Sequence, residues 1–194
     1  LPVVFQPELR RALEHIGRGR LFHSNRMISE EELAHMLDEI IPLTAGLSKT
    51  KTGALLVFER EVGLNEIIDT GIQIDGLVSK ELLGNIFIPN TPLHDGAVVI
   101  REGRIMAAGC LLPLTTDRSL STELGTRHRA AIGISEKSDA VVVVVSEETG
   151  AVSYTYGGHI YRHLTDEGLR KTLEGFFSKR PQGWVNFLKR RSDK

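Results

Sequence analysis

The sequence is poor in cysteine: Cys110 is the only one among 194 residues. A single thiol forms neither an intrachain disulfide nor a cysteine-rich zinc site, and such low usage is typical of a reducing compartment. Because Cys110 lies in an apolar run, we expect it to be a small buried hydrophobic residue.

Long hydrophobic runs are also missing. The longest covers residues 140–145, whereas a membrane-spanning helix needs about 20 apolar residues. The chain begins with Leu1 instead of Met, which is typical of a fragment whose upstream part, here expected to be hydrophobic, has been removed.

Neither sign of charge is in excess. The 24 Lys and Arg residues balance 25 Asp and Glu residues, and the net charge is -1. Such a chain offers no overall positive field to a nucleic acid, so a general DNA- or RNA-binding function is disfavoured and no nucleic acid partner is expected.

Several common catalytic motifs are absent from the sequence. It contains no phosphate-binding loop of the form G-x-x-x-x-G-K-[ST], no G-x-G-x-x-G after a strand, no H-E-x-x-H and no G-x-S-x-G. A kinase, a P-loop ATPase, a Rossmann dehydrogenase, a zinc protease and an α/β-hydrolase are therefore poorly supported.

The sequence does contain interleaved strand and helix patterns. Ser29 and Glu32 have the spacing of a capping box that starts a helix, which Pro42 is expected to weaken or end. Apolar or alternating runs predict strands at residues 54–58, 72–78, 97–100, 104–112, 140–145 and 151–156. Further helices are expected at residues 6–16, 80–88, 122–133 and 165–177. This pattern predicts a single α/β domain with a central mixed β-sheet covered by helices.

The first candidate site is the stretch His94-Asp95-Gly96-Ala97, directly before an expected strand. Ligands of open α/β sheets bind where strands end. A carboxylate followed by Gly and Ala lets the backbone approach a ligand closely, and the neighbouring imidazole offers a second metal ligand. The alternative is that Asp-Gly forms only a turn before the strand.

The second candidate site is Gly125-Thr126-Arg127-His128-Arg129, at the expected start of a helix. Two guanidinium groups beside an imidazole, a hydroxyl and a glycine place donors and positive charge where a phosphate would bind. The two arginines are two positions apart, so on a helix they would point in different directions and serve different phosphates or partners. The alternative is a solvated basic turn.

The third candidate site is Ser146-Glu147-Glu148, immediately after the run of valines. A hydroxyl and two carboxylates at the end of a buried strand can receive ribose hydroxyls or a cation. The alternative is an ordinary polar turn that leads to Thr149 and Gly150.

Together these motifs resemble the diadenylate cyclase (DAC, DisA_N) domain. Asp-Gly-Ala at residues 95–97 is followed by Arg-His-Arg at residues 127–129, in the frame Leu-Gly-Thr-Arg-His-Arg-Ala-Ala-Ile-Gly-Ile-Ser-Glu, and then by Val-Val-Ser-Glu-Glu-Thr-Gly. The resemblance runs from about Gly46 to Tyr161. Residues 4–13 are similar to the segment that joins the membrane helices to the cyclase domain in the membrane-anchored CdaA type.

The resemblance implies the condensation of two ATP molecules into cyclic di-AMP, with release of two pyrophosphates and with a divalent metal ion (Mn2+, Mg2+ or Co2+). It implies catalytic roles for Asp95, Arg127, His128 and Arg129. Asp95 would hold the metal, with His94 as a candidate further ligand, and Leu112 would meet the adenine through its backbone. The remaining expected ATP contacts are Gly96, Ala97, Gly125, Thr126, Ser146, Glu147 and Glu148.

A cyclic product requires each nucleotide to attack the other, so two sites must face one another. We therefore expect a homodimer, or a larger assembly, with facing active sites.

The resemblance further implies a cytoplasmic domain of a membrane-anchored parent, with regulatory protein partners. We expect a helical segment at residues 1–45, a cyclase core at 46–161 and a helix with a basic tail at 162–194. Two other functions stay open: a non-catalytic nucleotide-binding regulatory module and a metal-dependent nucleotide phosphohydrolase.

Overall fold

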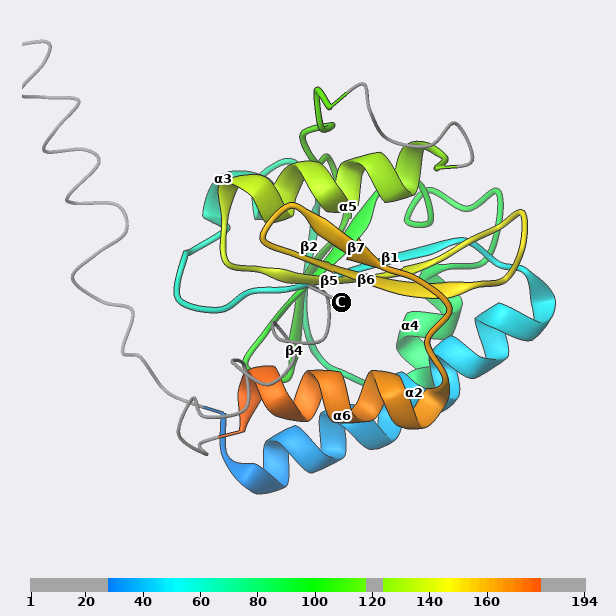
Figure 1. The fold of residues 1–194 in the computed structure, drawn as a ribbon. Coiled ribbons are helices and arrows are strands. Elements are labelled where there is room, and N and C mark those ends of the chain that lie inside the picture. The colour runs from blue at the N-terminus through cyan, green and yellow to red at the C-terminus, as the bar shows by residue number, and fades with distance from the viewer. Residues whose placement is uncertain (1–27, 118–123, 179–194) are drawn as a thin grey trace, which may run out of the picture.

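The computed structural model describes residues 28–117 and 124–178 (Figure 1). The helix expected at residues 6–16 and the basic tail lie outside this part. The described helices are α2 Glu30–Thr50, α3 Asn65–Ile68, α4 Lys80–Ile86, α5 Thr126–Lys137 and α6 Asp166–Phe177. The described strands are β1 Ala54–Phe58, β2 Ile72–Leu77, β3 Ala97–Arg101, β4 Arg104–Cys110, β5 Val141–Val145, β6 Val152–Tyr156 and β7 His159–Tyr161.

The strands of the described residues form one seven-stranded sheet in the order β2-β4-β3-β1-β5-β6-β7. Strands β1 and β3 are parallel, whereas β1 and β5 are antiparallel. The predicted α/β class and mixed sheet are confirmed. Within the described parts of the chain, no helix is both long and apolar enough to cross a membrane.

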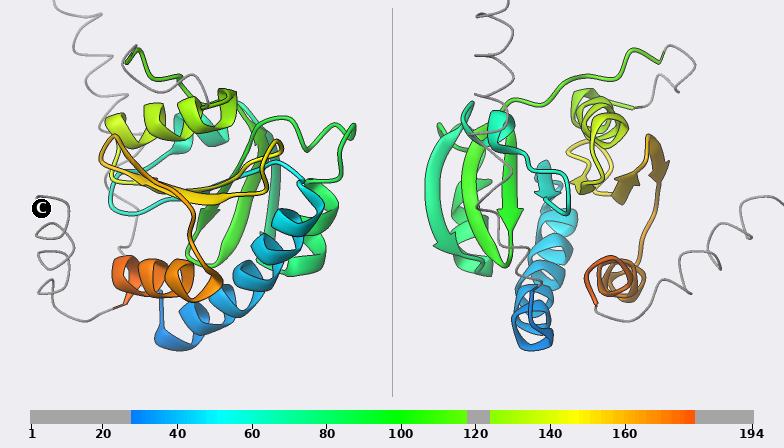
Figure 2. Two further views of the ribbon diagram at one scale, coloured as in Figure 1. Left: turned by 45° about the vertical axis from the view of Figure 1, so that its right-hand side comes forward. Right: turned by 90° about the vertical axis from the view of Figure 1, so that its left-hand side faces the viewer.

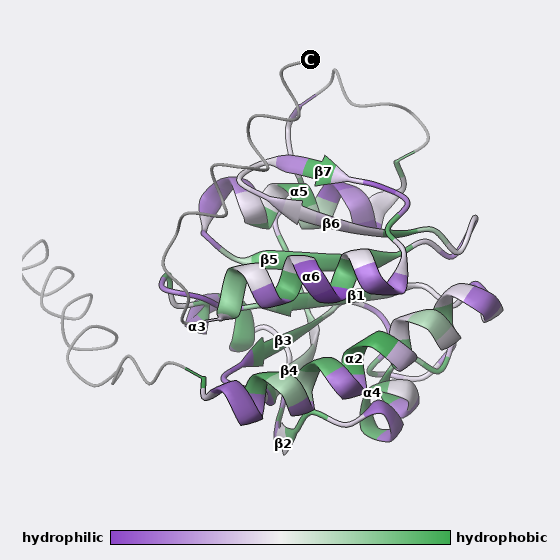
Figure 3. Ribbon diagram, turned by 60° about the horizontal axis from the view of Figure 1, so that its bottom comes forward, coloured by the Kyte–Doolittle hydropathy of each residue, from purple (hydrophilic) through white to green (hydrophobic). Residues whose placement is uncertain are grey.

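Helices cover both faces of the sheet (Figures 1 and 2): α2, α4 and α6 lie on one face, and α3 and α5 on the other. Alternate residues of β1 supply the two cores. Leu56 packs with α2, α4 and α6, while Leu55 packs with α3 and α5. In Figure 3, β1 and β5 are coloured as hydrophobic, in keeping with strands that are buried on both faces. Cys110 is buried, as expected.

The capping box of α2 is present as predicted. The backbone N–H of Glu32 donates to Ser29 Oγ at 3.1 Å, and the Ser29 N–H donates to Glu32 Oε2 at 2.9 Å. These bonds satisfy backbone donors that the first helical turn would otherwise leave without a partner.

Pro42 does not end this helix, because α2 continues to Thr50, and its weakening effect stays a prediction. Proline removes one backbone donor from a helix interior. Burial of α2 side chains on both sides of the proline stabilises the continuous helix.

Some elements differ from their expected bounds. Helix α5 begins and ends four residues later than expected, at Thr126 and Lys137. The short elements α3 and β7 were not expected, because four or three residues carry too little periodicity to be recognised. Helix α2 runs continuously across residues 45 and 46, and the division into three segments stays a prediction.

Polar side chains clamp the sheet where β1 and β3 end. Glu59 is buried, and Arg101 donates through Nε to its Oε1 at 2.5 Å and through Nη2 to its Oε2 at 2.7 Å. The Leu64 N–H and the Asn65 side chain bind the same pair. This network satisfies a carboxylate that would be costly to bury alone.

Removal of one partner tests this clamp. Arg101→Ala leaves the Glu59 carboxylate buried without its cation, so we expect the free energy of unfolding to fall by about 3 kcal/mol or more. Urea denaturation measures the loss. The control is Arg104→Ala, because Arg104 and Asp75 form an exposed ion pair worth less than about 1 kcal/mol. Equal losses in the two variants would contradict the assignment.

Candidate active site

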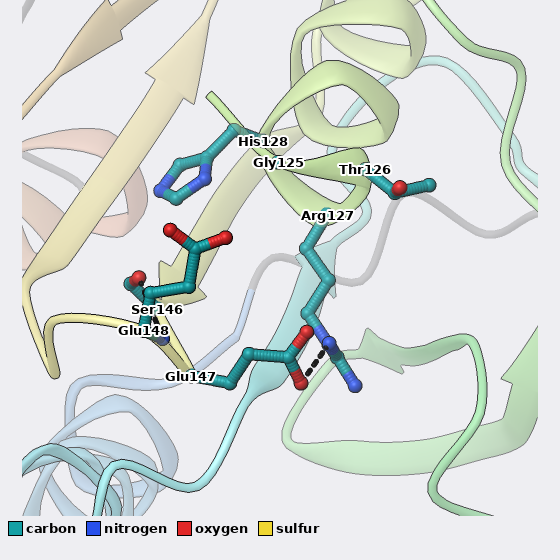
Figure 4. Close-up of a pocket in the computed structure, with 7 residues that line it drawn as sticks. All are labelled: Gly125, Thr126, Arg127, His128, Ser146, Glu147 and Glu148. Carbon is teal, nitrogen blue, oxygen red and sulfur yellow. Dashed lines mark hydrogen bonds and ion pairs between the residues drawn. The ribbon is translucent and has the colours of Figure 1, made fainter. Parts of the chain in front are cut away.

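A pocket lies near the start of β1, at the end opposite the Glu59–Arg101 pair, and the second and third candidate motifs meet there (Figure 4). It is lined by Gly125, Thr126, Arg127, His128, Ser146, Glu147 and Glu148. The first four come from the start of α5, and the others follow β5. The antiparallel pairing of β1 with β5 places the end of β5 beside the start of β1.

The start of α5 presents backbone N–H groups to the pocket. Gly125 is the N-cap residue and provides no side-chain hydrogen bond to the first turn. The positive end of a helix with free N–H groups favours a bound anion such as phosphate. Thr126, the first residue of the helix, is exposed beside these donors.

The two arginines of this motif have different surroundings. Arg127 lines the pocket, and its Nη1 lies 2.6 Å from Glu147 Oε2. Arg129 does not line it, and its Nε donates to the Leu124 carbonyl at 3.3 Å. Among the described residues, Arg127 is therefore the arginine that lines the pocket.

His128 is a buried imidazole in the pocket wall. Burial lowers the pKa of His128, the charge of Arg162 lowers it further, and Glu148 acts in the opposite direction. The ring is therefore neutral at pH 7 and can both donate and accept a hydrogen bond. The motifs gave no indication of Arg162, which follows β7 in the sequence and reaches this site only through the fold.

The turn after β5 is closed by hydrogen bonds. Ser146 Oγ accepts from the N–H groups of Glu148 and Thr149 at 3.3 and 3.2 Å. From the end of α2, the Ser48 hydroxyl donates to the Gly150 carbonyl at 2.6 Å. The segment is thus a polar turn that also lines the pocket, and its contact with a ribose or a cation stays a prediction.

The first motif lies at the same end of the sheet as the pocket, because β1 and β3 are parallel and both begin there. Asp95 is exposed in the loop before β3 and does not line the pocket. His94 Nδ1 lies 2.6 Å from the Thr91 carbonyl, while Nε2 has one long contact, 3.4 Å from the Asn90 N–H. A ring that donates from Nδ1 keeps its lone pair on Nε2, as in many metal-binding histidines.

The structure explains why position 96 is a glycine. Its φ is +125°, and an added Cβ would lie 2.7 Å from the carbonyl carbon of Gly109 in β4. A side chain is excluded by the neighbouring strand. Ala97 is fully buried and Leu112 is half-buried in the same core, so any ligand contact of Ala97 would be made by its backbone.

The candidate metal ligands His94 and Asp95 form only part of a site for a divalent cation. In the described residues no cluster of three or more His, Cys, Asp or Glu side chains could hold a metal ion. His94 and Asp95 nevertheless supply adjacent nitrogen and oxygen ligands. Magnesium-type sites commonly combine one or two protein ligands with substrate phosphates and water. Such a pair suits only a cation that also binds phosphate oxygens of a ligand.

The chain is similar to proteins of known class. The model of the family described as "DisA bacterial checkpoint controller nucleotide-binding" matches residues 44–160. The cyclic di-AMP synthase CdaA of Bacillus subtilis (strain 168) is 50% identical over 177 residues, which are 91% of this chain and 65% of that protein. A diadenylate cyclase of Listeria monocytogenes (strain 10403S) is 49% identical over 88% of this chain and 63% of its own length. The chain thus spans less than two thirds of these relatives.

Solved structures agree with this similarity. A crystal structure of a cysteine double mutant of DacA from Staphylococcus aureus has a TM-score of 0.75 and 45% identity, and the match covers 77% of this chain and 99% of that one. A hypothetical membrane spanning protein from Bacillus cereus has a TM-score of 0.64 and 46% identity, and the match covers 66% and 63% of the two chains.

The burial of His128 predicts a dependence of stability on pH. Its pKa is lowered in the folded protein, so between the folded value and about 6.5 the unfolded chain binds more protons. The free energy of unfolding is therefore expected to fall as the pH is lowered from 7.5 to 5, and to fall less in His128→Gln. Urea denaturation at each pH measures this. His35→Gln, which removes an exposed imidazole of α2, is the control. An unchanged pH profile in His128→Gln would refute the interpretation.

Proposed function

The chain belongs to the diadenylate cyclase (DAC) family, the DisA-type nucleotide-binding domain, and from this premise we propose that it condenses two ATP molecules into cyclic di-AMP. Two pyrophosphates are released. The observation that carries the proposal is the pocket at the start of α5, where a first turn without a side-chain cap, Arg127 and a neutral His128 meet the acidic turn after β5.

In this reaction a ribose 3′-hydroxyl attacks the α-phosphorus of the other nucleotide, and pyrophosphate leaves. Negative charge grows on the leaving phosphates, so fixed donors and cations that face them lower the barrier. We assign this role to Arg127 and the N–H groups of α5, with Arg129 as a second cation. The neutral His128 provides a hydrogen bond without adding charge.

A phosphate group can replace Glu147 as the partner of Arg127. The Glu147 side chain is 59% exposed, and an ion pair at such a site contributes at most about 1 kcal/mol. Phosphate oxygens bind a guanidinium group in a bidentate manner. Glu147 then becomes available to a ribose hydroxyl or a cation, and Ser146 and Glu148 complete this side of the pocket.

Asp95 and His94 are proposed to hold the divalent cation. A bound cation of this kind polarises phosphoryl oxygens and makes a hydroxyl a better nucleophile. A carboxylate is itself a weak base towards an alcohol, so Asp95 is assigned to binding the ion instead of taking the proton. Mn2+, Mg2+ and Co2+ are the candidate ions.

The cyclic product requires an assembly of two copies. Each ATP must present its hydroxyl to the other, and one site alone cannot complete the ring. A homodimer with facing sites brings an exposed Asp95 from each copy to the paired nucleotides. We further propose that the parent protein is anchored at a membrane with its cyclase part in the cytoplasm, which the similarity to the Bacillus cereus membrane spanning protein supports.

Product analysis tests the proposed function. The protein is incubated with ATP and each of the three cations, and the nucleotides are separated by chromatography. We expect cyclic di-AMP and pyrophosphate. AMP or ADP as the product would indicate a phosphohydrolase, and bound but unchanged ATP would indicate a regulatory module. Either result would overturn the proposal.

The role of Asp95 is tested by Asp95→Asn. Loss of a metal-binding carboxylate removes several kcal/mol of transition-state stabilisation, so cyclase activity is expected to fall by about a hundredfold or more. The melting temperature should stay unchanged because Asp95 is exposed. Asp38→Asn, which changes an exposed aspartate of α2, is the control. Near-normal turnover in Asp95→Asn would remove Asp95 from the central role.

A further inference from the structure

Gly53 is a buried residue directly before β1. A Cβ atom at this position would lie 2.8 Å from Cζ of Arg127 and 3.0 Å from both Nε and Nη1. Non-bonded carbon atoms in contact are about 3.5–4.0 Å apart. A side chain therefore does not fit at position 53 while Arg127 keeps its place. The guanidinium group packs directly against the backbone of Gly53.

The three distances show which side of the guanidinium group meets Gly53. The added atom would be nearer to the central carbon Cζ than to the two nitrogens bound to it. A neighbour in the guanidinium plane would meet a nitrogen first, because the nitrogens surround the carbon. Gly53 therefore covers the flat face. The N–H donors point outward in the plane, and Nη1 reaches Glu147 Oε2 at 2.6 Å.

We propose that Gly53 is a positioning residue for the chemistry of this pocket: its bare backbone supports the flat face of Arg127, so that the in-plane donors are aimed at the nucleotide phosphates. The inference rests on the proposed function. Phosphate is bound through the edge of a guanidinium group. Donors that are held in place before the reaction lower its barrier most.

The local structure makes this role separable from folding. The φ angle of Gly53 lies outside the left-handed region, so alanine can adopt the same backbone conformation. The atoms that its methyl group would meet belong to the far end of a flexible side chain. Gly53→Ala should therefore keep the fold and move the guanidinium group by about 1 Å. Gly96 differs, because its close neighbours are backbone atoms.

Steady-state kinetics of Gly53→Ala with ATP tests the proposal. Misplacement of a catalytic group by about 1 Å costs up to a hundredfold, so kcat/KM is expected to fall about 10- to 100-fold, with a lower kcat and a higher KM. The melting temperature should not change. The control is Gly63→Ala in an exposed loop, where an added Cβ meets no atom within 4 Å. Unchanged kinetics, or a lower kcat with an unchanged KM, would overturn the proposal.

A double-mutant cycle with Arg127→Lys shows whether Gly53 acts through Arg127. The lysine ammonium has no flat face that needs a bare surface. Added to Arg127→Lys, the Gly53→Ala change should reduce kcat/KM by less than about twofold, because coupled residues are not additive. A further 10-fold loss would show that Gly53 acts independently of Arg127, and would overturn the proposal.

Calorimetry of ATP binding separates this inference from the proposed function. If the wild-type protein binds ATP but forms no cyclic product, the proposed function fails, and weaker ATP binding by Gly53→Ala still supports the inference. Equal ATP affinity in the two proteins overturns it. If the wild-type protein binds no ATP, both fail.

Discussion

Complete burial of the central strands β1 and β5 is the constraint on which the location of all polar chemistry depends. The five residues of each strand are buried, and the strands pair from Ala54 with Val145 to Phe58 with Val141. A buried polar group without a partner costs about 1–3 kcal/mol. Along β1 and β5, polar side chains are therefore confined to the strand ends, with the Glu59–Arg101 clamp at one end of β1 and the pocket at the other.

A Glu–Arg ion pair lies near each end of β1, and the two pairs have different roles. Glu59 is only 3% exposed in its side chain and is held by Arg101 and backbone N–H donation, so this pair cannot be exchanged for water or ligand without a large cost. Glu147 is 59% exposed, and its ion pair with Arg127 contributes at most about 1 kcal/mol. Solvent access makes the first pair structural and leaves the second open to a ligand.

Much of the fold could be predicted because its signals are local. The capping box at Ser29 and the run of valines in β5 each specify their element from neighbouring residues alone. A local rule could not predict that α2 continues past Pro42, since such a rule does not include the burial of the helix around the proline. In the site, the second and third motifs meet as strand and helix ends should, but the roles of Arg162 and Gly53 depend on contacts between distant segments.

The sequence by itself determined the α/β class, the family and the residue types available for phosphate and cation binding, because these follow from short-range patterns and from motifs within single segments. Only the tertiary structure decided that Arg127 and not Arg129 lines the pocket, that burial lowers the pKa of His128 and that Asp95 is exposed. Those properties depend on burial and on charges brought close by strand pairing, and linear order does not specify distance across a sheet.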